Sequence, residues 1–241
     1  MIVRRRGIRQ GAAASVSNAY DDFSGSGALN SSLWNFEDHS GTAATVVTVT
    51  RSGGKYDGAM ASGNANPSTW FNADQGLHHY FTCTGDFEFI ARSIGVADAT
   101  TDDFQAAFVQ IWGSDHVYEF VAPGNFGTGR NQILECKIND ATGGGDSETA
   151  DVTSALTGGL CDLRVQRVGS TVSWYRQGPT DGTATDSWTD ITSSFTGMFK
   201  SRAPFGTGAV RVCIGAYGFE TIAACTAEIL QVELPTGTAV V

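Results

Sequence analysis

The chain has 241 residues, of which 41% are hydrophobic and 17% are charged, and its formal net charge is −10. This composition predicts a globular protein with a hydrophobic core and excludes an intrinsically disordered chain. No stretch approaches the roughly 18 consecutive apolar residues of a transmembrane helix, so the sequence predicts none.

Residues 1–19 begin with a basic cluster. The first ten residues contain no acid and hold four of the 15 basic residues of the chain, Arg4, Arg5, Arg6 and Arg9. No apolar segment follows this cluster, so we expect no secretory signal peptide. The remaining 11 basic residues face 25 acidic ones, which argues against nucleic-acid binding, because phosphate contacts need a dense Lys/Arg surface. We expect an extended arm that stays in solvent or docks onto an acidic partner assembly.

From residue 20 to residue 235 the chain consists mostly of short runs in which apolar and polar residues alternate. In the run 86–92, "DFEFIAR", odd-numbered residues face one side and even-numbered residues the other, as in a strand with one buried face. Such runs, without a sustained 3.6-residue period, predict an all-β, antiparallel jelly-roll β-sandwich followed by a C-terminal tail, 236–241. One short helix or 3₁₀ turn is expected near 151–156 or 191–199. The runs include 41–54, 85–95, 105–115, 116–124, 131–140, 159–169, 171–178, 209–218 and 225–234.

Residues 163–177 read as a β-hairpin with a tight turn at 168–171, "VGST". One face of the hairpin should point inward and the other outward. A loop then leads to Trp188, which we expect to pack over one end of a sheet. The predicted inward residues are Leu163, Val165, Val172 and Trp174, and the outward residues are Arg164, Gln166, Ser173 and Tyr175.

Five cysteines are scattered along the chain without C-x-x-C spacing, and an odd number cannot pair fully within one chain. Most lie inside strand-like runs, where a thiol is usually a small buried hydrophobe. We therefore expect reduced thiols in a protein made in a cytoplasm, and no metal site. The cysteines are Cys83, Cys136, Cys161, Cys213 and Cys225.

The hairpin resembles one found in concanavalin A-like lectin/glucanase jelly rolls, in particular their laminin-G-like and DUF1349-like branches. The resemblance covers roughly residues 20–234 and implies a jelly roll, a fold that hosts lectins, glycosidases and structural modules alike. Laminin-G-like relatives can hold calcium on rim loops, which implies Asp181, Asp186 and Asp190 here, although an ordinary turn would use the same residues. The segments that carry the resemblance are 21–37, 85–93, 163–177, 181–191 and 227–234.

Catalytic and metal-binding patterns are absent from the sequence. A glucanase of this fold should show an E-x-D-x-x-E strand, and no such strand occurs. Asp86 and Glu88 share a face, but they lie at the start of a strand and read as a solvated turn. His78 and His79 would point to opposite faces of a strand, so they could not chelate one metal together, and we expect ordinary polar surface there. The sequence therefore predicts no enzyme and no metal cofactor.

Carbohydrate binding needs exposed aromatic rings beside amide or acid groups, because a sugar offers an apolar C–H face and a ring of hydroxyls. The candidates are Trp70, Trp112, His116 and Tyr118. Packing in the core or at the rim is the competing interpretation for Trp70 and Trp112. The other tryptophans, Trp34, Trp174 and Trp188, fit the core pattern better.

A lectin-like jelly roll without an export signal, and with free thiols, favours a protein of a phage or virus particle. Such proteins fold in the host cytoplasm, and concanavalin A-like domains are common in phage tails, fibres and capsid decorations. We expect a non-enzymatic structural and binding module that docks through its basic arm, with other virion proteins, its own copies and a cell-surface glycan as partners. We expect no nucleic acid and no membrane insertion. The alternative is a carbohydrate-binding lectin module outside any virion, and a glycoside hydrolase ranks third.

Overall fold

The computed structural model describes residues 20–38, 47–60, 63–64, 77–96, 104–114, 117–126, 133–140, 147–152, 160–178, 187–195, 205–219, 221–222 and 225–241. The arm arginines Arg4, Arg5, Arg6 and Arg9 lie outside these residues, as do Trp70, His116, Asp181 and Asp186. The predictions made for them stay predictions.

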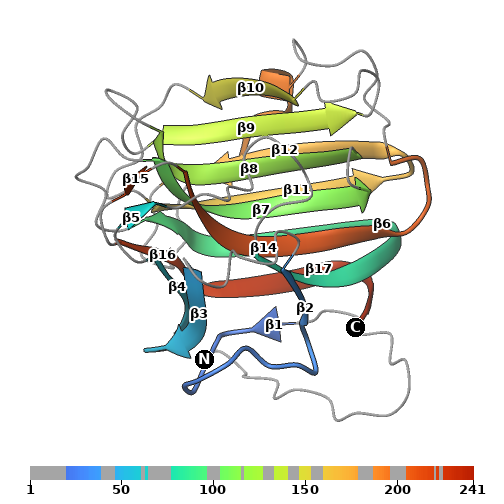
Figure 1. Ribbon diagram of the computed structural model, residues 1–241. Helices are drawn as coiled ribbons and strands as arrows, with labels where there is room; N and C mark the ends of the chain where they lie inside the picture. Colours follow the sequence, from blue (N-terminus) through green and yellow to red (C-terminus); the bar gives the residue numbers. More distant parts are fainter. Residues whose placement is uncertain are drawn as a thin grey trace.

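The described residues form β-strands and one 3₁₀ helix, as the alternating runs predict (Figure 1). The 3₁₀ helix, Thr192–Phe195, lies within one of the two segments where a turn of helix was expected. The first strands are β1 (Tyr20–Asp21), β2 (Asn35–Asp38), β3 (Val47–Ser52), β4 (Lys55–Met60), β5 (Gly63–Asn64), β6 (Leu77–Val96), β7 (Phe104–Ser114), β8 (Val117–Phe126) and β9 (Ile133–Asp140). The others are β10 (Ser147–Val152), β11 (Leu160–Val168), β12 (Thr171–Gln177), β13 (Thr189–Asp190), β14 (Val210–Phe219), β15 (Thr221–Ile222), β16 (Cys225–Ile229) and β17 (Gln231–Val240).

The 20-residue strand β6 takes part in both layers of the sandwich. Along one edge it pairs first with β14, at residues 79–83, and then with β11, at residues 87–95. Gly85, with φ of 68°, lies between these two segments. One layer has the order β10-β9-β8-β7-β14-β6, and the other continues from β6 through β11 and β12 to β13 (Figure 1).

The other edge of β6 is covered in succession by β2, β17 and β16. Strand β17 runs to Val240 and pairs with β6 as far as Thr82. Residues 236–240, expected in a C-terminal tail, therefore belong to this strand, because their backbone groups complete the edge of β6. No helix in the described residues is long and apolar enough to span a membrane.

The hydrophobic core lies between the two layers and contains the inward residues of the predicted hairpin. Leu163, Val165, Val172 and Trp174 are each at most 1% exposed, so their predicted orientation is confirmed. The Trp174 indole Nε1 donates a 2.7 Å hydrogen bond to Glu119 Oε2 of β8. A buried carboxylate of one layer is thus hydrogen-bonded to a buried indole of the other.

Three of the five cysteines have described side chains, and all three are buried, free thiols, as the sequence predicts: Cys83, Cys161 and Cys213. Burial raises the pKa of each thiol above its usual value. The side chains of Cys136 and Cys225 are outside the described part.

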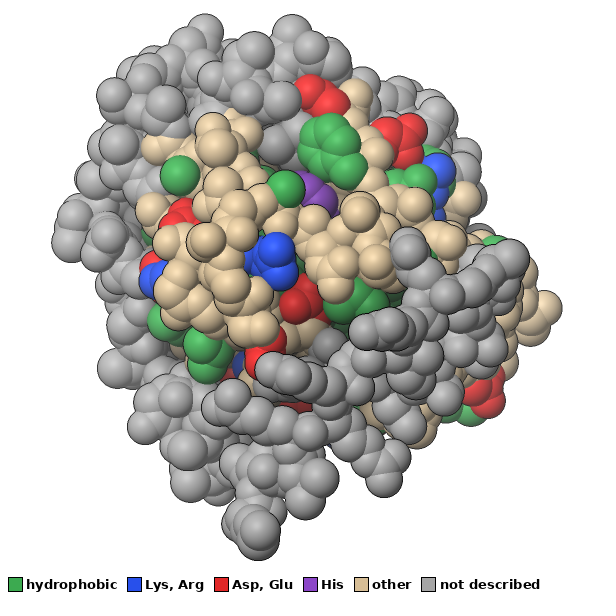
Figure 2. All heavy atoms as spheres, turned by 90° about the horizontal axis from the view of Figure 1, so that it is seen from below, with side chains coloured by type: hydrophobic (Ala, Val, Ile, Leu, Met, Phe, Trp, Pro, Cys, Tyr) green, Lys and Arg blue, Asp and Glu red, His purple; other side chains and the backbone are tan. Residues whose placement is uncertain are grey.

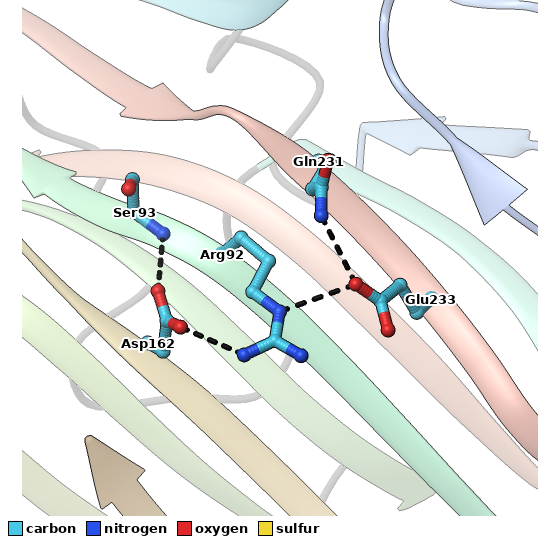
Figure 3. Close-up of polar contacts among 5 residues, drawn as sticks. All are labelled: Arg92, Ser93, Asp162, Gln231 and Glu233. Atoms are coloured by element: carbon cyan, nitrogen blue, oxygen red, sulfur yellow. Dashed lines mark hydrogen bonds and ion pairs between the residues drawn. The ribbon is translucent and has the colours of Figure 1, made fainter. Parts of the chain in front are cut away.

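A bulge changes the alternation of β6 near its end. Ser93 has φ of 46°, and the pairing of β11 with β6 shifts register between Cys161 and Leu163. The fully buried Asp162 accepts bonds from Ser93 N, at 2.9 Å, and from Arg92 Nη1, at 2.8 Å (Figure 3). The paired carboxylate therefore satisfies the backbone N–H that the bulge removes from the ladder.

Gly237 offers a test of how β17 closes against β6. Its φ is +115°, and a Cβ at this position would lie 2.6 Å from Phe87 Cβ. We expect Gly237→Ala to lower the free energy of unfolding by about 3 kcal/mol, because backbone strain and overpacking add. Urea unfolding followed by circular dichroism measures the change.

Gly208→Ala is the matched control, since a Cβ there would meet nothing within 4 Å and its φ is not positive. Equal unfolding midpoints for the two variants would contradict the close approach of β17 to Phe87.

Candidate functional site

A second buried cluster lies on the face of β7, β8 and β14 that points away from the inter-layer core. It arises because alternate residues of each strand face opposite sides of a sheet. Residues 107, 109 and 111 of β7 face the core, and residues 106 and 108 face the second cluster. We call this surface the aromatic face. Its residues are Ala106, Phe108, Tyr118, Phe120, Ala122 and Cys213, with the half-buried Tyr80 and Trp112 packed against them.

Strand register arranges these side chains in rows across the sheet. Trp112 of β7 lies opposite Tyr118 of β8 and opposite Arg211 of β14. The next row holds Phe120, Gln110, Cys213 and Tyr80, contributed by β8, β7, β14 and β6 in that order.

Arg211 lies at the accessible edge of the aromatic face. Its guanidinium carbon is 4.2 Å from the centroid of Tyr80 and 4.3 Å from that of Trp112. Its Nη1 donates a 2.6 Å hydrogen bond to Glu37 Oε2 of β2, so the positive charge is matched by a carboxylate. Stacking on two rings fixes the plane of the guanidinium.

Gln110 places a polar side chain among these rings. Its side chain is only 6% exposed, and Oε1 has no hydrogen-bond partner among the residues that the structure describes. By strand alternation it points to the same side as Phe108 and Trp112. An acceptor buried without a donor costs about 1–3 kcal/mol, so a donor from a ligand or a water molecule would be stabilised there.

Two of the four predicted carbohydrate-binding residues, Trp112 and Tyr118, are brought together as a cross-strand pair. Trp112 is half-buried, but Tyr118 is only 1% exposed. The expected exposure is therefore wrong for Tyr118, because its ring packs with Phe120, 6.4 Å away between centroids, inside the cluster. Their role in carbohydrate binding stays a prediction.

Sequence reasoning missed Glu37, Tyr80, Gln110 and Arg211 as members of this face. The alternation in 105–115 and 209–218 could have placed Gln110 and Arg211 on a common side, had the two runs been assigned as neighbours. Glu37 and Tyr80 meet the face only through the pairing of β2, β6 and β14, which local pattern does not specify.

The histidine pair alternates between faces, as predicted. His78 contacts Phe108 of the aromatic face, with ring centroids 5.9 Å apart, and His79 contacts Tyr56 of the core at 6.0 Å. The expectation of ordinary polar surface is wrong, because the two residues are only 1% and 7% exposed. Burial lowers the pKa of His79 to about 4. Figure 2 shows a histidine beside hydrophobic side chains on the side of the molecule seen from below. The ring of His79 also contacts the exposed Phe36, with centroids 5.1 Å apart.

The described residues contain no group of three or more His, Cys, Asp or Glu side chains that could hold a metal ion. Of the three predicted calcium ligands, Asp190 is described, and its Oδ1 accepts a 2.7 Å hydrogen bond from Thr192 N. Asp86, considered above as half of an acid pair, accepts a 2.7 Å bond from Gly169 N. Both aspartates thus bond to backbone amides of turns.

No family model matches this sequence, and no curated protein does either. Solved structures match over nearly the whole chain. A pseudo β-1,3-glucanase and immunostimulatory antigen of Mycobacterium tuberculosis is 14% identical, covers 94% of this chain and 99% of its own, and has a TM-score of 0.55. The CBM2 module of the evolved Dit of Lactobacillus casei BL23 phage J-1 is 7% identical, with coverages of 92% and 96% and a TM-score of 0.53.

A functionally unknown protein from Saccharomyces cerevisiae also matches, at 10% identity and a TM-score of 0.51, covering 87% of this chain and 96% of its own. Identities this low show the fold alone. The described part of the chain folds as an all-β, antiparallel, concanavalin A-like jelly-roll β-sandwich, and the fold predicted from residue 20 onward is confirmed, whereas the extended arm stays a prediction.

His79 predicts a pH dependence of stability. Because its folded-state pKa of about 4 lies below the ordinary value of 6.5, the unfolded chain binds a proton that the folded chain rejects between these two values. The stabilisation is present above pH 6.5 and is lost as the pH falls toward 4, by about 3 kcal/mol in total.

In His79→Phe this loss should be absent, which chemical denaturation at pH 7.5, 5.5 and 4 would measure. The carboxylates that titrate in the same range are common to both proteins, so their effect cancels in the difference. If the free energy of unfolding changed equally with pH in the wild type and in His79→Phe, His79 would not be buried as a neutral ring.

Proposed function

We propose that this protein is a non-enzymatic structural and binding module of a phage or virus particle, whose sandwich binds carbohydrate through the aromatic face. The observation that carries the proposal is the group of half-buried side chains gathered around Arg211 at the edge of that face: Tyr80, Arg211, Trp112 and Glu37. Sugars stack their C–H faces on aromatic rings and bond their hydroxyls to amide, guanidinium and carboxylate groups. This group offers each of those functional groups except an amide, and Gln110, with its buried acceptor, lies in the same cross-strand row as Tyr80.

Binding without hydrolysis is the chemistry that these residues support. Retaining and inverting glycosidases need two carboxyl groups on either side of the scissile bond, about 5 Å or about 6.5–9.5 Å apart. At this edge of the aromatic face, the described carboxylate is Glu37, and Arg211 neutralises it. Glu119 projects from β8 on the other side of the sheet, toward Trp174.

The setting in a particle rests on three features. The sequence combines a basic arm, Arg4 to Arg9, with an acidic body, which suits docking onto an acidic assembly. The buried thiols suit folding in a host cytoplasm. A module of a phage protein has the same fold over nearly its full length. A tail, fibre or capsid-decoration protein that also contacts its own copies fits these features.

The alternative is a lectin-like module outside any virion. This alternative is supported by the same aromatic face and differs only in the partner of the arm. Association with a particle must therefore be tested separately from carbohydrate binding.

Trp112 provides the test of carbohydrate binding. We expect Trp112→Ala to weaken carbohydrate binding about tenfold, because the sugar loses one stacking ring and Arg211 loses one of the two rings on which it stacks. A glycan array, followed by affinity electrophoresis in gels containing laminarin, xyloglucan or dextran, measures the change.

Trp188→Ala is the matched control, because Trp188 is also a half-buried tryptophan stacked with arginines, but it lies beside β11, away from the aromatic face. Loss of neutral-glycan binding in Trp188→Ala alone would move the site to the other layer. Unchanged binding in both variants would sink the proposal for the aromatic face.

Sedimentation of the native protein from its source tests the particle. We expect the chain to travel with a virion-sized fraction, identified by mass spectrometry, and a chain lacking residues 1–16 to remain with the small soluble proteins. A full-length chain that stays at the top of the gradient would contradict the virion setting and leave the lectin alternative.

A further inference from the structure

The outward surface of β11 and β12 carries a second group of stacked rings and arginines, which we call the outer face. Arg164 of β11 lies opposite Tyr175 of β12 in register, and its guanidinium carbon is 4.0 Å from the Tyr175 ring centroid. The same guanidinium carbon is 4.8 Å from the centroid of Trp188. Trp188 is half-buried on this face, so the prediction that it belongs to the core is wrong. Its ring is held by arginines over the outside of the sheet.

Arg92, the other arginine on Trp188, has its charge matched. Its Nη1 donates to Asp162, its Nε donates to Glu233 at 3.2 Å, and Gln231 Nε2 also donates to Glu233 (Figure 3). Both nearby carboxylates are therefore committed to Arg92. This arrangement raises the pKa of Arg92 and keeps its charge fixed.

Arg164 differs in this respect from four of the other described arginines. Arg51, Arg92, Arg167 and Arg211 each donate to carbonyl or carboxylate oxygens. Within the described residues, no acidic side chain forms an ion pair with Arg164, and its buried Nε has no hydrogen-bond partner. Two described acids lie in the cross-strand row of Arg164. Asp190, beyond Tyr175, accepts from Thr192 N, and Glu233, on the other side beyond Ile90, accepts from Arg92 Nε.

We propose that Arg164 is an anion-binding residue, and that the outer face takes a carboxylate-bearing saccharide such as a polyuronate. A guanidinium held flat by stacking presents its N–H groups in the fork that matches a carboxylate in bidentate fashion. The half-buried rings of Tyr175 and Trp188 lie beside it, where a sugar ring can pack. The site is on the opposite layer from the aromatic face, so it does not depend on the proposed function.

A saccharide is favoured over an acidic protein surface by what surrounds Arg164. Protein interfaces depend on apolar anchors at their centre. The large hydrophobic side chains exposed in the described part of the chain are Phe36, Val168 and Val241. Phe36 belongs to β2 and Val241 follows β17. Val168 ends β11 at the hairpin turn, four residues from Arg164, and the nearer neighbours of Arg164, Gln166 and Ser173, are polar.

The test is affinity electrophoresis of the full chain in native gels containing polygalacturonate, with fully methyl-esterified polygalacturonate as the neutral form of the same backbone. We expect retardation by the acid form and none by the ester. Arg164→Gln should weaken binding about tenfold or more. Arg164→Lys, which keeps the charge and loses the planar fork, should weaken it several-fold.

Arg51→Gln is the control, because Arg51 belongs to β3, outside both faces, and its side chain donates only to the carbonyl oxygens of Ala28 and Ser24 in the described part of the chain. It should bind polygalacturonate as the wild type does, and circular dichroism melts check that each variant is folded. Wild-type behaviour of Arg164→Gln, equal retardation by the ester, or loss of binding in Arg51→Gln alone would overturn the proposal.

Two further polymers distinguish the sources of the anion. Equal, Arg164-dependent retardation by dextran sulfate would reject carboxylate recognition in favour of simple charge. Retardation by polyglutamate without polygalacturonate would reject a saccharide in favour of an acidic peptide. No retardation of the wild type by polygalacturonate would reject the site.

Discussion

Both layers of the sandwich share one strand, β6, and the position of each candidate binding surface follows from that constraint. The odd-numbered residues of β6 face the common core on both sides of Gly85, from Phe81 to Ala91. Its even-numbered residues must therefore face outward in both layers. The same strand thus supplies Tyr80 to the aromatic face and Arg92 to the outer face. Neither surface could shift in register without moving the other.

Two buried charged residues in the described part of the sandwich are each bonded to backbone groups. Asp162 is fully buried, yet it accepts one bond from a guanidinium and one from the amide of the bulge at Ser93. Arg167 is also fully buried and donates to the carbonyl oxygens of Gly169 and Gly206, at 3.1 and 3.2 Å. Desolvating an ion without such bonds would cost several kcal/mol. The bulge and the turns at these two glycines are therefore coupled to the core by electrostatics as well as by packing.

The alternation of apolar and polar residues correctly predicted which residues share a side of a strand. It did not predict whether that side is buried, because burial depends on which other strands pack there and on bulges. The hairpin of Leu163 and Trp174 was predicted correctly, because an alternating run with a glycine turn is a local signal. The burial of His78 and Tyr118 was not predicted. Both sides of β6 and β8 are covered at these residues, and alternation of apolar and polar residues marks a strand with only one buried side. Trp188 was assigned to the core because it fitted the local core pattern. Its stacking on Arg92 of β6 and Arg164 of β11 could not be predicted in this way, because both arginines are distant from Trp188 in the sequence.

The pairing of β6 also sets an order for folding during synthesis. Its neighbours β14 and β17 lie at residues 210–219 and 231–240, more than a hundred residues after β6 leaves the ribosome. Until those segments emerge, the edge of β6 that pairs with β17 stays largely unpaired and the other edge lacks β14. Unpaired strand edges are what aggregating chains join to. The long-range contacts of this strand also imply slow closure, because the cost of closing the loop precedes the gain from pairing. The sandwich therefore closes only after β17 has been synthesised, and its yield should depend on chaperone capacity more than that of a helical domain of equal length.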